Sequence, residues 1–358
     1  MNSDVETMFF LNPEVLPGRE VTKQAARGNL EALPGRRRDP WPLALVVVLV
    51  AAALPAIGDF PTWATLTVAA VAMGMMLFIM SSGLTLIFGL MDVMNFGHAS
   101  LVAVGAYTAT LFVPLVASLL NHESLAAGLL GVGLVLIGAA ASTGAVGWLF
   151  ERLFIRRLHG DHVKQILITV GALLIIEQSL IVLFGPNQMS LPLPEVLRGS
   201  LHIADVSVER YRIVAAVLGL FVFVGLHMVL KKTRVGLLIR AGVENREMVE
   251  ALGYPIKDLF LAVFVGGCAL AGLGGAMWGF YREQFTSLIG AEVLVQMLVI
   301  VIIGGLGSIQ GCLVAALLIG LVTNYVNFLL PEVSILTNIL AMMLVLLWRP
   351  RGLYDVGA

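Results

Sequence analysis

Long apolar stretches separated by short polar segments dominate the chain. A helix needs about 20 apolar residues to cross a hydrocarbon core of about 30 Å. Windows without Asp, Glu, Lys or Arg can therefore be read as membrane spans. Seven windows, of which only Gln165–Phe184 contains a charged residue (Glu177), each predict one transmembrane helix: Pro42–Gly58, Ala99–Leu119, Leu125–Phe150, Gln165–Phe184, Ile213–Leu230, Leu259–Phe280 and Val333–Trp348.

Two further charge-free windows are too long for one perpendicular helix. Thr62–Met91 would extend about 45 Å as a helix, so we expect it to be tilted, or broken near Ser81-Ser82-Gly83. Val293–Leu330 would extend about 57 Å. The glycines of Gly304-Gly305-Leu306-Gly307-Ser308 predict a break that divides it into two spans. The expected total is ten transmembrane helices.

The distribution of Lys and Arg predicts the orientation. Six lie in residues 1–40, four in 151–164, six in 231–257 and two after the last span, whereas Arg198, Arg210, Arg212 and Arg282 fall in the alternate loops. Positive residues concentrate on the cytoplasmic side of membrane proteins. We therefore expect both termini in the cytoplasm, with a cytoplasmic extension at 1–40, a membrane domain at 41–350 containing a cytoplasmic loop at 231–257, and a tail at 351–358.

Composition excludes several classes of protein. The chain is 59% hydrophobic and 13% charged, against about 45–50% and 25% in soluble domains, and its mean hydropathy is +0.95. A net charge of −1 does not favour nucleic acid. The two cysteines form no metal-type cluster, and the sequence has no Walker loop, HExxH or GxSxG. We expect an integral membrane protein that is not an enzyme and binds no metal or cofactor.

Two polar sites interrupt the apolar background. Asp92, Asn95 and His98 follow a long apolar run, with glycines on both sides. They fit a broken segment beside a translocation path, because irregular backbone at membrane depth must be buried or line a water-filled cavity. They fit equally a short cytoplasmic turn. Glu177 lies inside the fifth span; it is a functional candidate, although it is near enough to the outer end to reach the interface.

The loop at 231–257 contains a charged segment with a helical pattern. From Glu244 to Leu252, apolar Met248, Val249 and Leu252 recur at helical spacing, and Gly253 and Pro255 then end the helix. One interpretation is an amphipathic helix that docks into a groove of a soluble partner. The other is a positively charged anchor with a solvated face, which the residues by themselves favour.

A stripe of small residues marks the seventh span. Gly267, Ala271, Gly275 and Gly279 recur every four residues, so one helix face can approach a neighbour closely. Packing explains this stripe, and no ligand is inferred from it. Gln296, Asn324 and Asn327 predict hydrogen bonds between helices.

Four stretches, in order, resemble the branched-chain amino acid permeases of ABC importers, the LivH/LivM family. They are the run from Gly83 to Ala99 with Gly105-Ala106-Tyr107, the loop segment from Glu244 to Gly253, the element from Gly304 to Gly311, and the ending Arg349-Pro350-Arg351-Gly352-Leu353-Tyr354. The resemblance extends over about residues 80–354 and identifies the chain as similar to these permeases.

The resemblance implies an all-α importer permease of the bacterial inner membrane, with spans two to five and seven to ten as a possible inverted repeat. It implies four kinds of partner: a second permease subunit, two cytoplasmic ATP-binding subunits, an extracytoplasmic solute-binding protein and a small solute. The solute would be a branched-chain amino acid or, as in other relatives, urea, a short amide or another small carboxylate. ATP hydrolysis would take place in the partner subunits.

By the same resemblance, the segment at 244–253 becomes the element that couples to the ATPase, with Glu244, Arg246, Glu247, Met248, Glu250 and Gly253 as its residues. Asn95, His98 and Glu177 are the expected residues of the translocation path. The alternative is an ion-coupled secondary transporter that acts without ATPases, with Asp92, His98 and Glu177 as a proton relay. The small number of ionisable groups within the spans disfavours that alternative.

Overall fold

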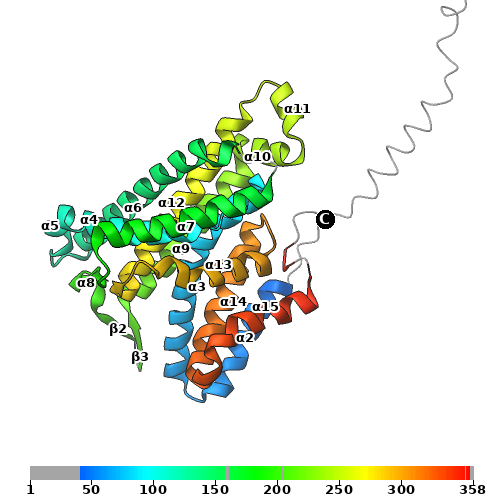
Figure 1. The fold of residues 1–358 in the computed structure, drawn as a ribbon. Helices are drawn as coiled ribbons and strands as arrows, with labels where there is room; N and C mark the ends of the chain where they lie inside the picture. Colours follow the sequence, from blue (N-terminus) through cyan, green and yellow to red (C-terminus); the bar gives the residue numbers. More distant parts are fainter. Residues whose placement is uncertain (1–40, 158–160, 204, 351, 355–358) are drawn as a thin grey trace, which may run out of the picture. The chain divides into compact units, whose positions relative to one another are not determined.

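The computed structural model describes residues 41–157, 161–203, 205–350 and 352–354. The described residues from Pro42 onward belong to the second of two units, and this unit is described below. The predicted extension at 1–40, and most of the predicted tail at 351–358, lie outside the described residues. Within the described part, the second unit consists mostly of helices (Figure 1).

Ten apolar helices correspond to the predicted windows. They are α2 (Trp41–Ile57), α3 (Phe60–Met91), α4 (His98–Phe112), α6 (Leu125–Leu153), α7 (His162–Phe184), α9 (Arg210–Lys232), α12 (Ile256–Arg282), α13 (Ile289–Gly304), α14 (Ile309–Leu329) and α15 (Thr337–Trp348). Six of these are long and apolar enough to cross a membrane, or seven when α4 is joined to the bent segment after it. The helices α2, α13 and α15 are shorter. The chain is thus a helical membrane protein, and ten spans stay a prediction.

Shorter elements lie between these helices. They are η1 (Pro114–Val116), α5 (Ala117–Leu120), η2 (Ile155–Arg157), α8 (Glu195–Arg198), α10 (Arg234–Glu244), α11 (Arg246–Ala251) and η3 (Pro331–Leu336). Two small antiparallel ladders modify the expected all-α class. One pairs β1 (Met189–Ser190) with β4 (Gln284–Phe285), and the other pairs β2 (Ser200–Ile203) with β3 (Val206–Glu209).

The helix α3 is continuous, so a break near Ser81-Ser82-Gly83 is wrong and tilt is the alternative that remains. Ser82 and Thr85 satisfy their hydroxyls within the continuous helix. Ser82 Oγ donates to the carbonyl of Ile79 at 2.8 Å, and Thr85 Oγ1 donates to the carbonyl of Ser81 at 2.8 Å. Such bonds satisfy a buried hydroxyl inside its own helix.

Two breaks in other spans have clear chemical causes. The predicted break after Gly304 is confirmed: Gly305 and Gly307 have φ of +91° and +79°, a region that favours glycine. Ser308 then caps α14 by accepting from the Gly311 N–H at 3.1 Å. The expected single span Ala99–Leu119 is bent by 40° after α4, where Pro114 cannot continue the helical hydrogen bonds.

The small-residue stripe lets α12 pack closely against two other helices. A Cβ at Gly267 would lie 2.8 Å from the Gly83 carbonyl oxygen of α3, and a Cβ at Gly275 would lie 2.0 Å from the Val102 carbonyl oxygen of α4. Only glycine permits these backbone approaches. The predicted role of the stripe in packing is confirmed, and the contacts of α12 with α3, α4 and α6 form the centre of the unit.

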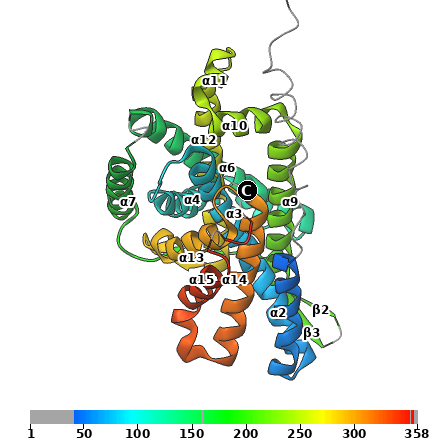
Figure 2. The same cartoon turned by 90° about the vertical axis from the view of Figure 1, so that its right-hand side faces the viewer.

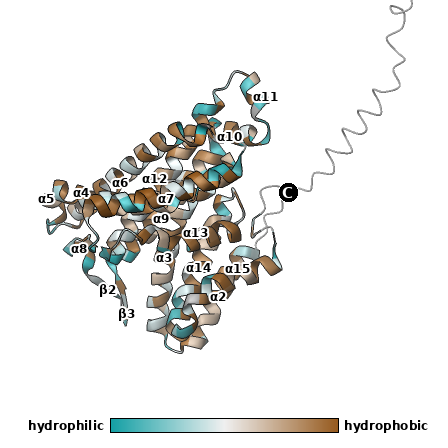
Figure 3. Ribbon diagram, viewed as in Figure 1, coloured by the Kyte–Doolittle hydropathy of each residue, from teal (hydrophilic) through white to brown (hydrophobic). Residues whose placement is uncertain are grey.

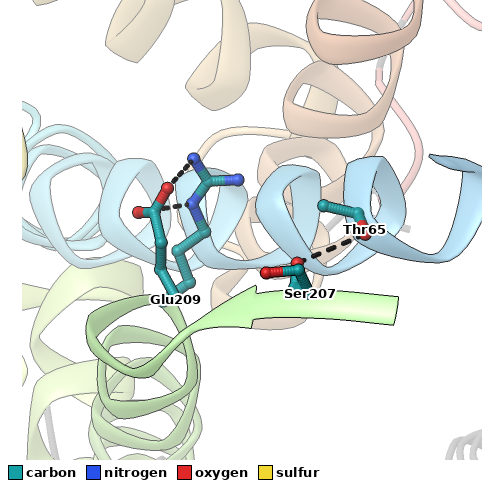
Figure 4. Close-up of polar contacts among 4 residues, drawn as sticks. Thr65, Ser207 and Glu209 are labelled. Carbon is teal, nitrogen blue, oxygen red and sulfur yellow. Dashed lines mark hydrogen bonds and ion pairs between the residues drawn. The ribbon is translucent and has the colours of Figure 1, made fainter. Parts of the chain in front are cut away.

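The β2–β3 hairpin is attached to the side of α3 (Figure 4). Thr65 Oγ1 donates to the carbonyl of Ser207 at 3.3 Å. At the end of β3, Glu209 accepts two hydrogen bonds from Arg212, at 3.0 and 2.8 Å. The ion pair joins the hairpin to the first turn of α9, so it ties two consecutive elements together.

Candidate functional site

The polar turn between α3 and α4 contains both exposed and buried residues. Asp92 ends α3 with φ of +54° and is exposed. Its carboxylate lies 3.5 Å from Nε2 of His162 at the start of α7. Val93 and Asn95 are buried. One end of the turn is therefore exposed, and the other is buried against neighbouring helices.

The Asn95 side chain is buried without hydrogen-bond partners in the described part of the chain. Only 2% of the residue is exposed, and both Oδ1 and Nδ2 are unpaired there. Asn95 borders a small cavity between α4, α6 and α7, which also has Leu101, Phe150 and Ile176 in its wall. Its volume of about 10 Å³ is near the minimum for one water molecule. A buried amide without partners costs about 1–3 kcal/mol per group, so the site favours a polar guest.

His98 points away from this cavity and into α3. The residue is fully buried, and its Nε2 lies 3.0 Å from the Met80 carbonyl oxygen. A carbonyl can only accept, so Nε2 carries the hydrogen and donates it. A Cβ at Gly83 would lie 3.0 Å from His98 Cε1. His98 thus fixes the beginning of α4 against α3, and it does not meet Asn95 in the cavity.

One face of α7 is polar and buried. Gln165, Thr169 and Glu177 lie on it, and all three are buried. Thr169 Oγ1 lies 3.3 Å from both the Phe96 N–H and the Met94 carbonyl, and thereby ties the turn to α7. Thr169 was not among the predicted site residues. The spacing of four between Gln165 and Thr169, and of eight between Thr169 and Glu177, was a signal that could have found it.

The rest of α7 is strongly exposed. Its main helix neighbour is α4, and it stands at one edge of the unit in Figure 2. Apolar side chains on the outer face, such as Val182 and Leu183, are 84% and 75% exposed. Asp161 caps the helix, and hydrogen bonding to Lys164 lowers the pKa of this carboxyl. The helix therefore has a polar inner face and an apolar outer face.

The predicted coupling segment forms two helices, not one. Glu244 is the last residue of α10. Asn245 then caps α11 by accepting from the Met248 N–H at 2.9 Å, so the helix expected from Glu244 begins at Arg246. Asn245 explains this correction, since an N-cap residue lies outside the helix that it starts.

The end of α11 is as predicted. Gly253 has φ of +87°, and the Tyr254 N–H bonds to the Val249 carbonyl at 3.3 Å, as in a glycine-terminated helix. Val249 is buried, whereas Met248 and Leu252 are 63% and 70% exposed. Glu247 and Glu250 are also exposed. Figure 3 shows hydrophilic residues gathered on α10 and α11. The segment presents an exposed surface of apolar and acidic side chains.

Three of the sequence stretches that carry the resemblance meet at one place. A Cβ at Gly89 in α3 would lie 2.0 Å from the Gly307 Cα. The chain end folds back onto α13: the Leu353 N–H donates to the Ile303 carbonyl at 2.7 Å, and the Tyr354 N–H to the Gly304 carbonyl at 3.3 Å. These glycine-rich stretches therefore pack the backbone together, which accounts for their composition without a ligand.

Comparison with known proteins identifies the family of the chain. Residues 66–348 match the family model described as the permease component of the branched-chain amino acid transport system. The chain is 26% identical over 281 residues to the high-affinity branched-chain amino acid transport system permease protein BraD of Pseudomonas aeruginosa, with 76% of this chain and 89% of that protein covered.

The corresponding LivH protein of Escherichia coli is 23% identical over 289 residues, with 79% of this chain and 92% of LivH covered. The LivM protein of Escherichia coli is 26% identical over 314 residues, with 80% and 69% covered. No solved structure matches the chain. These relatives are named as transport permeases, which confirms the expectation of a transport protein and not an enzyme.

Proposed function

Since the chain belongs to the family of permease components of branched-chain amino acid transport systems, we propose that it is the membrane permease subunit of an ABC importer for branched-chain or related amino acids in the bacterial inner membrane. It would work with a second permease, two ATP-binding subunits and an extracytoplasmic solute-binding protein. The proposed topology has ten spans with both termini in the cytoplasm, with spans two to five and seven to ten as an inverted repeat.

The observation that carries the proposal is the exposed surface of α11. A short capped helix that presents exposed apolar side chains beside acidic ones is suited to docking into a groove of a partner protein. Met248 and Leu252 supply the apolar contacts, and Glu247 and Glu250 supply charge. Together with Glu244, Arg246 and Gly253, they form the proposed coupling element.

The proposed translocation path follows the inner face of α7. Asn95 and Glu177 contribute polar groups there, and both have buried atoms without partners in the described residues. His98 contributes by holding α4 against α3. In the importer, ATP binding to the partner subunits would shift the pore between outward and inward access, and α11 would transmit that bias.

Purification of the tagged protein from its own host in a gentle detergent tests the assembly. Two ATPase chains and a second permease, identified by mass, are the expected companions. A single species that still transports solute in ATP-free liposomes would overturn the importer in favour of the ion-coupled carrier.

Glu247→Lys tests the coupling element in the reconstituted importer. Reversing this exposed charge should abolish ATP-driven uptake while the variant inserts normally, because the site on the ATPase must meet the opposite charge. Glu123→Lys is the matched control, since Glu123 is an exposed glutamate between α5 and α6. Uptake by Glu247→Lys equal to that of the control would contradict the assignment.

A further inference from the structure

An apolar groove lies where α10 packs against the membrane helices. It has a volume of about 370 Å³, within the range of about 300–1,000 Å³ typical of ligand sites. Side chains of α3, α6, α9, α10 and α12 line it, and every lining residue is apolar. Leu230 of α9, Val235 of α10 and Gly266 of α12 are among the lining residues. Such a lining suits a hydrocarbon chain and offers nothing to a polar solute.

The flanks of the groove are basic. Within two positions of a lining residue lie five basic residues and one acidic residue, Asp258. The basic ones are Lys231, Lys232, Arg234, Arg240 and Lys257. All five are exposed. An apolar groove next to clustered positive charge matches a molecule with an apolar chain and an anionic head.

Arg240 connects the charge to the groove. Its Nη1 donates to the Leu230 carbonyl at 2.6 Å, and Leu230 lines the groove. This bond satisfies one carbonyl in the last turn of α9, where helix carbonyls have no partner within the helix. A guanidinium has five N–H donors, so Arg240 can hold the end of α9 and also bind a phosphate.

The helix α10 has the character of a helix that lies at a membrane surface. Val235, Leu237 and Val243 are exposed apolar residues, and Arg234 and Arg240 are exposed cations on the same eleven-residue helix. Helices with this combination lie in the interface, with the apolar face toward acyl chains and the cations at the headgroups. This combination of exposed apolar and cationic side chains suits the region where lipid headgroups and acyl chains meet.

We propose that the groove binds one anionic phospholipid, with an acyl chain along α9 and α12 and the headgroup phosphate at Arg240, Arg234 and Lys232. The lipid fastens α10 to α9 and α12, and so holds the α10–α11 segment at the membrane. The lipid comes from the cytoplasmic leaflet; this assignment of the leaflet rests on the orientation given in the proposed function. A zwitterionic lipid would fit the groove but gain less from the cations.

Native mass spectrometry of the delipidated full chain tests this site. Phosphatidylglycerol and phosphatidylcholine with identical acyl chains are titrated separately, and glycerol phosphate is titrated as a headgroup without chains. Phosphatidylglycerol should bind more tightly, since each cation near an anionic headgroup adds about a factor of five in affinity. Equal binding of the two lipids would overturn the proposal, as would binding of glycerol phosphate as strong as that of phosphatidylglycerol.

Two pairs of variants distinguish the contribution of the basic side chains to lipid affinity from that of the apolar groove. Lys232→Gln should lower the affinity for phosphatidylglycerol about fivefold without touching the bond from Arg240, and Arg152→Gln on α6 is the charge control. Gly266→Leu should block the groove, because a Cβ there meets nothing within 4 Å. Gly133→Leu on α6 is equally unobstructed and lies outside the lining. Lipid binding by Gly266→Leu equal to that of Gly133→Leu would overturn the site.

A protein in the groove is the remaining outcome. If the purified complex shows another polypeptide cross-linked to Gly266→Cys and no bound lipid, the proposal is overturned. Lipid affinity does not depend on ATPases or on transport, so failure of the importer assignment would leave these measurements unchanged.

Discussion

The helices α12 and α7 have similar hydropathy but different surroundings. Their most apolar windows have mean hydropathies of 2.0 and 2.4, yet 56% of the first and 17% of the second is buried inside the unit. The helix α12 contacts its neighbours through glycines at backbone distance, whereas α7 contacts the turn before α4 through Thr169 and α4 itself through the Tyr107–Phe184 ring pair. Hydropathy therefore identifies a span, while the residues on its inner face distinguish a central packing helix from one at the edge.

The largest expected effect comes from a substitution that disrupts the packing of α12. Gly275→Ala places a Cβ 2.0 Å from a backbone oxygen of α4, and a backbone cannot move aside as a side chain can. We expect the free energy of unfolding to fall by about 3 kcal/mol. Gly266→Ala on the same helix is the control, since its Cβ meets nothing, and it should change stability by less than about 1 kcal/mol. Denaturation in detergent measures both; equal stability would show that α12 is not closely packed.

The next effect concerns transport and stability together. Asn95→Leu removes a buried amide whose atoms have no partner in the described residues. The free energy of unfolding should stay the same or rise, because replacing an unsatisfied polar group with an apolar one of similar size is nearly neutral or stabilising. Solute uptake should fall about tenfold if this amide serves the path, a change equivalent to about 1.4 kcal/mol. Uptake at the wild-type level would place the path elsewhere.

A smaller effect tests the attachment of the turn to α7. Thr169→Val keeps the shape of the side chain but loses the contacts with Phe96 and Met94. The expected loss of stability is about 1 kcal/mol, the typical net contribution of one hydrogen bond, since the part-buried bond from the N–H of Phe96 is lost. Hydrogen exchange at residues 94–97 measures the loosening. Ser179→Ala is the control, because the Ser179 hydroxyl bonds only to its own helix, at the Ile175 carbonyl, in the described structure. Equal exchange in the two variants would contradict the attachment.

The smallest effect is a pH dependence at the start of α7. Hydrogen bonding to Lys164 lowers the pKa of Asp161 below its usual value. A lowered pKa in the folded state stabilises the protein above the unfolded pKa, and the effect is lost as pH falls through the folded one. Protection of the first turn of α7 should therefore decline on acidification below about pH 4, and Asp161→Asn should remove that decline. A decline that persists in the variant would assign it to another group.

Several elements followed from the residues alone. The helix windows, the break at Gly304, the stop at Gly253 and the packing of the glycine stripe each rest on local chemistry, such as charge-free length, positive φ or the absence of a Cβ. Other expectations failed for reasons that are also physical. Asn245 capped α11 and shifted its start, α3 is continuous past Ser82 and Thr85, whose hydroxyls bond within the helix, and Pro114 bent the third span.

The candidate site also has a part that the sequence predicted and a part that only the structure showed. Asn95, His98 and Glu177 were selected because polar residues among apolar ones are uncommon, and all three are buried. That His98 turns to α3 while Asn95 turns to α7 could not be predicted, because neighbours along the chain point in different directions once the turn is folded. Thr169 was identified as part of the site only from the structure, in which it accepts a hydrogen bond from the Phe96 N–H of the turn.

The sequence by itself determined that this is a multi-span membrane permease, because hydrophobic length and family motifs are properties of the chain. Tertiary structure alone decided which faces meet. Side chains from five helices form the apolar groove, and three distant glycine-rich stretches pack at one point. Such contacts depend on how helices cross, and helix crossing is set by the shapes of both surfaces together.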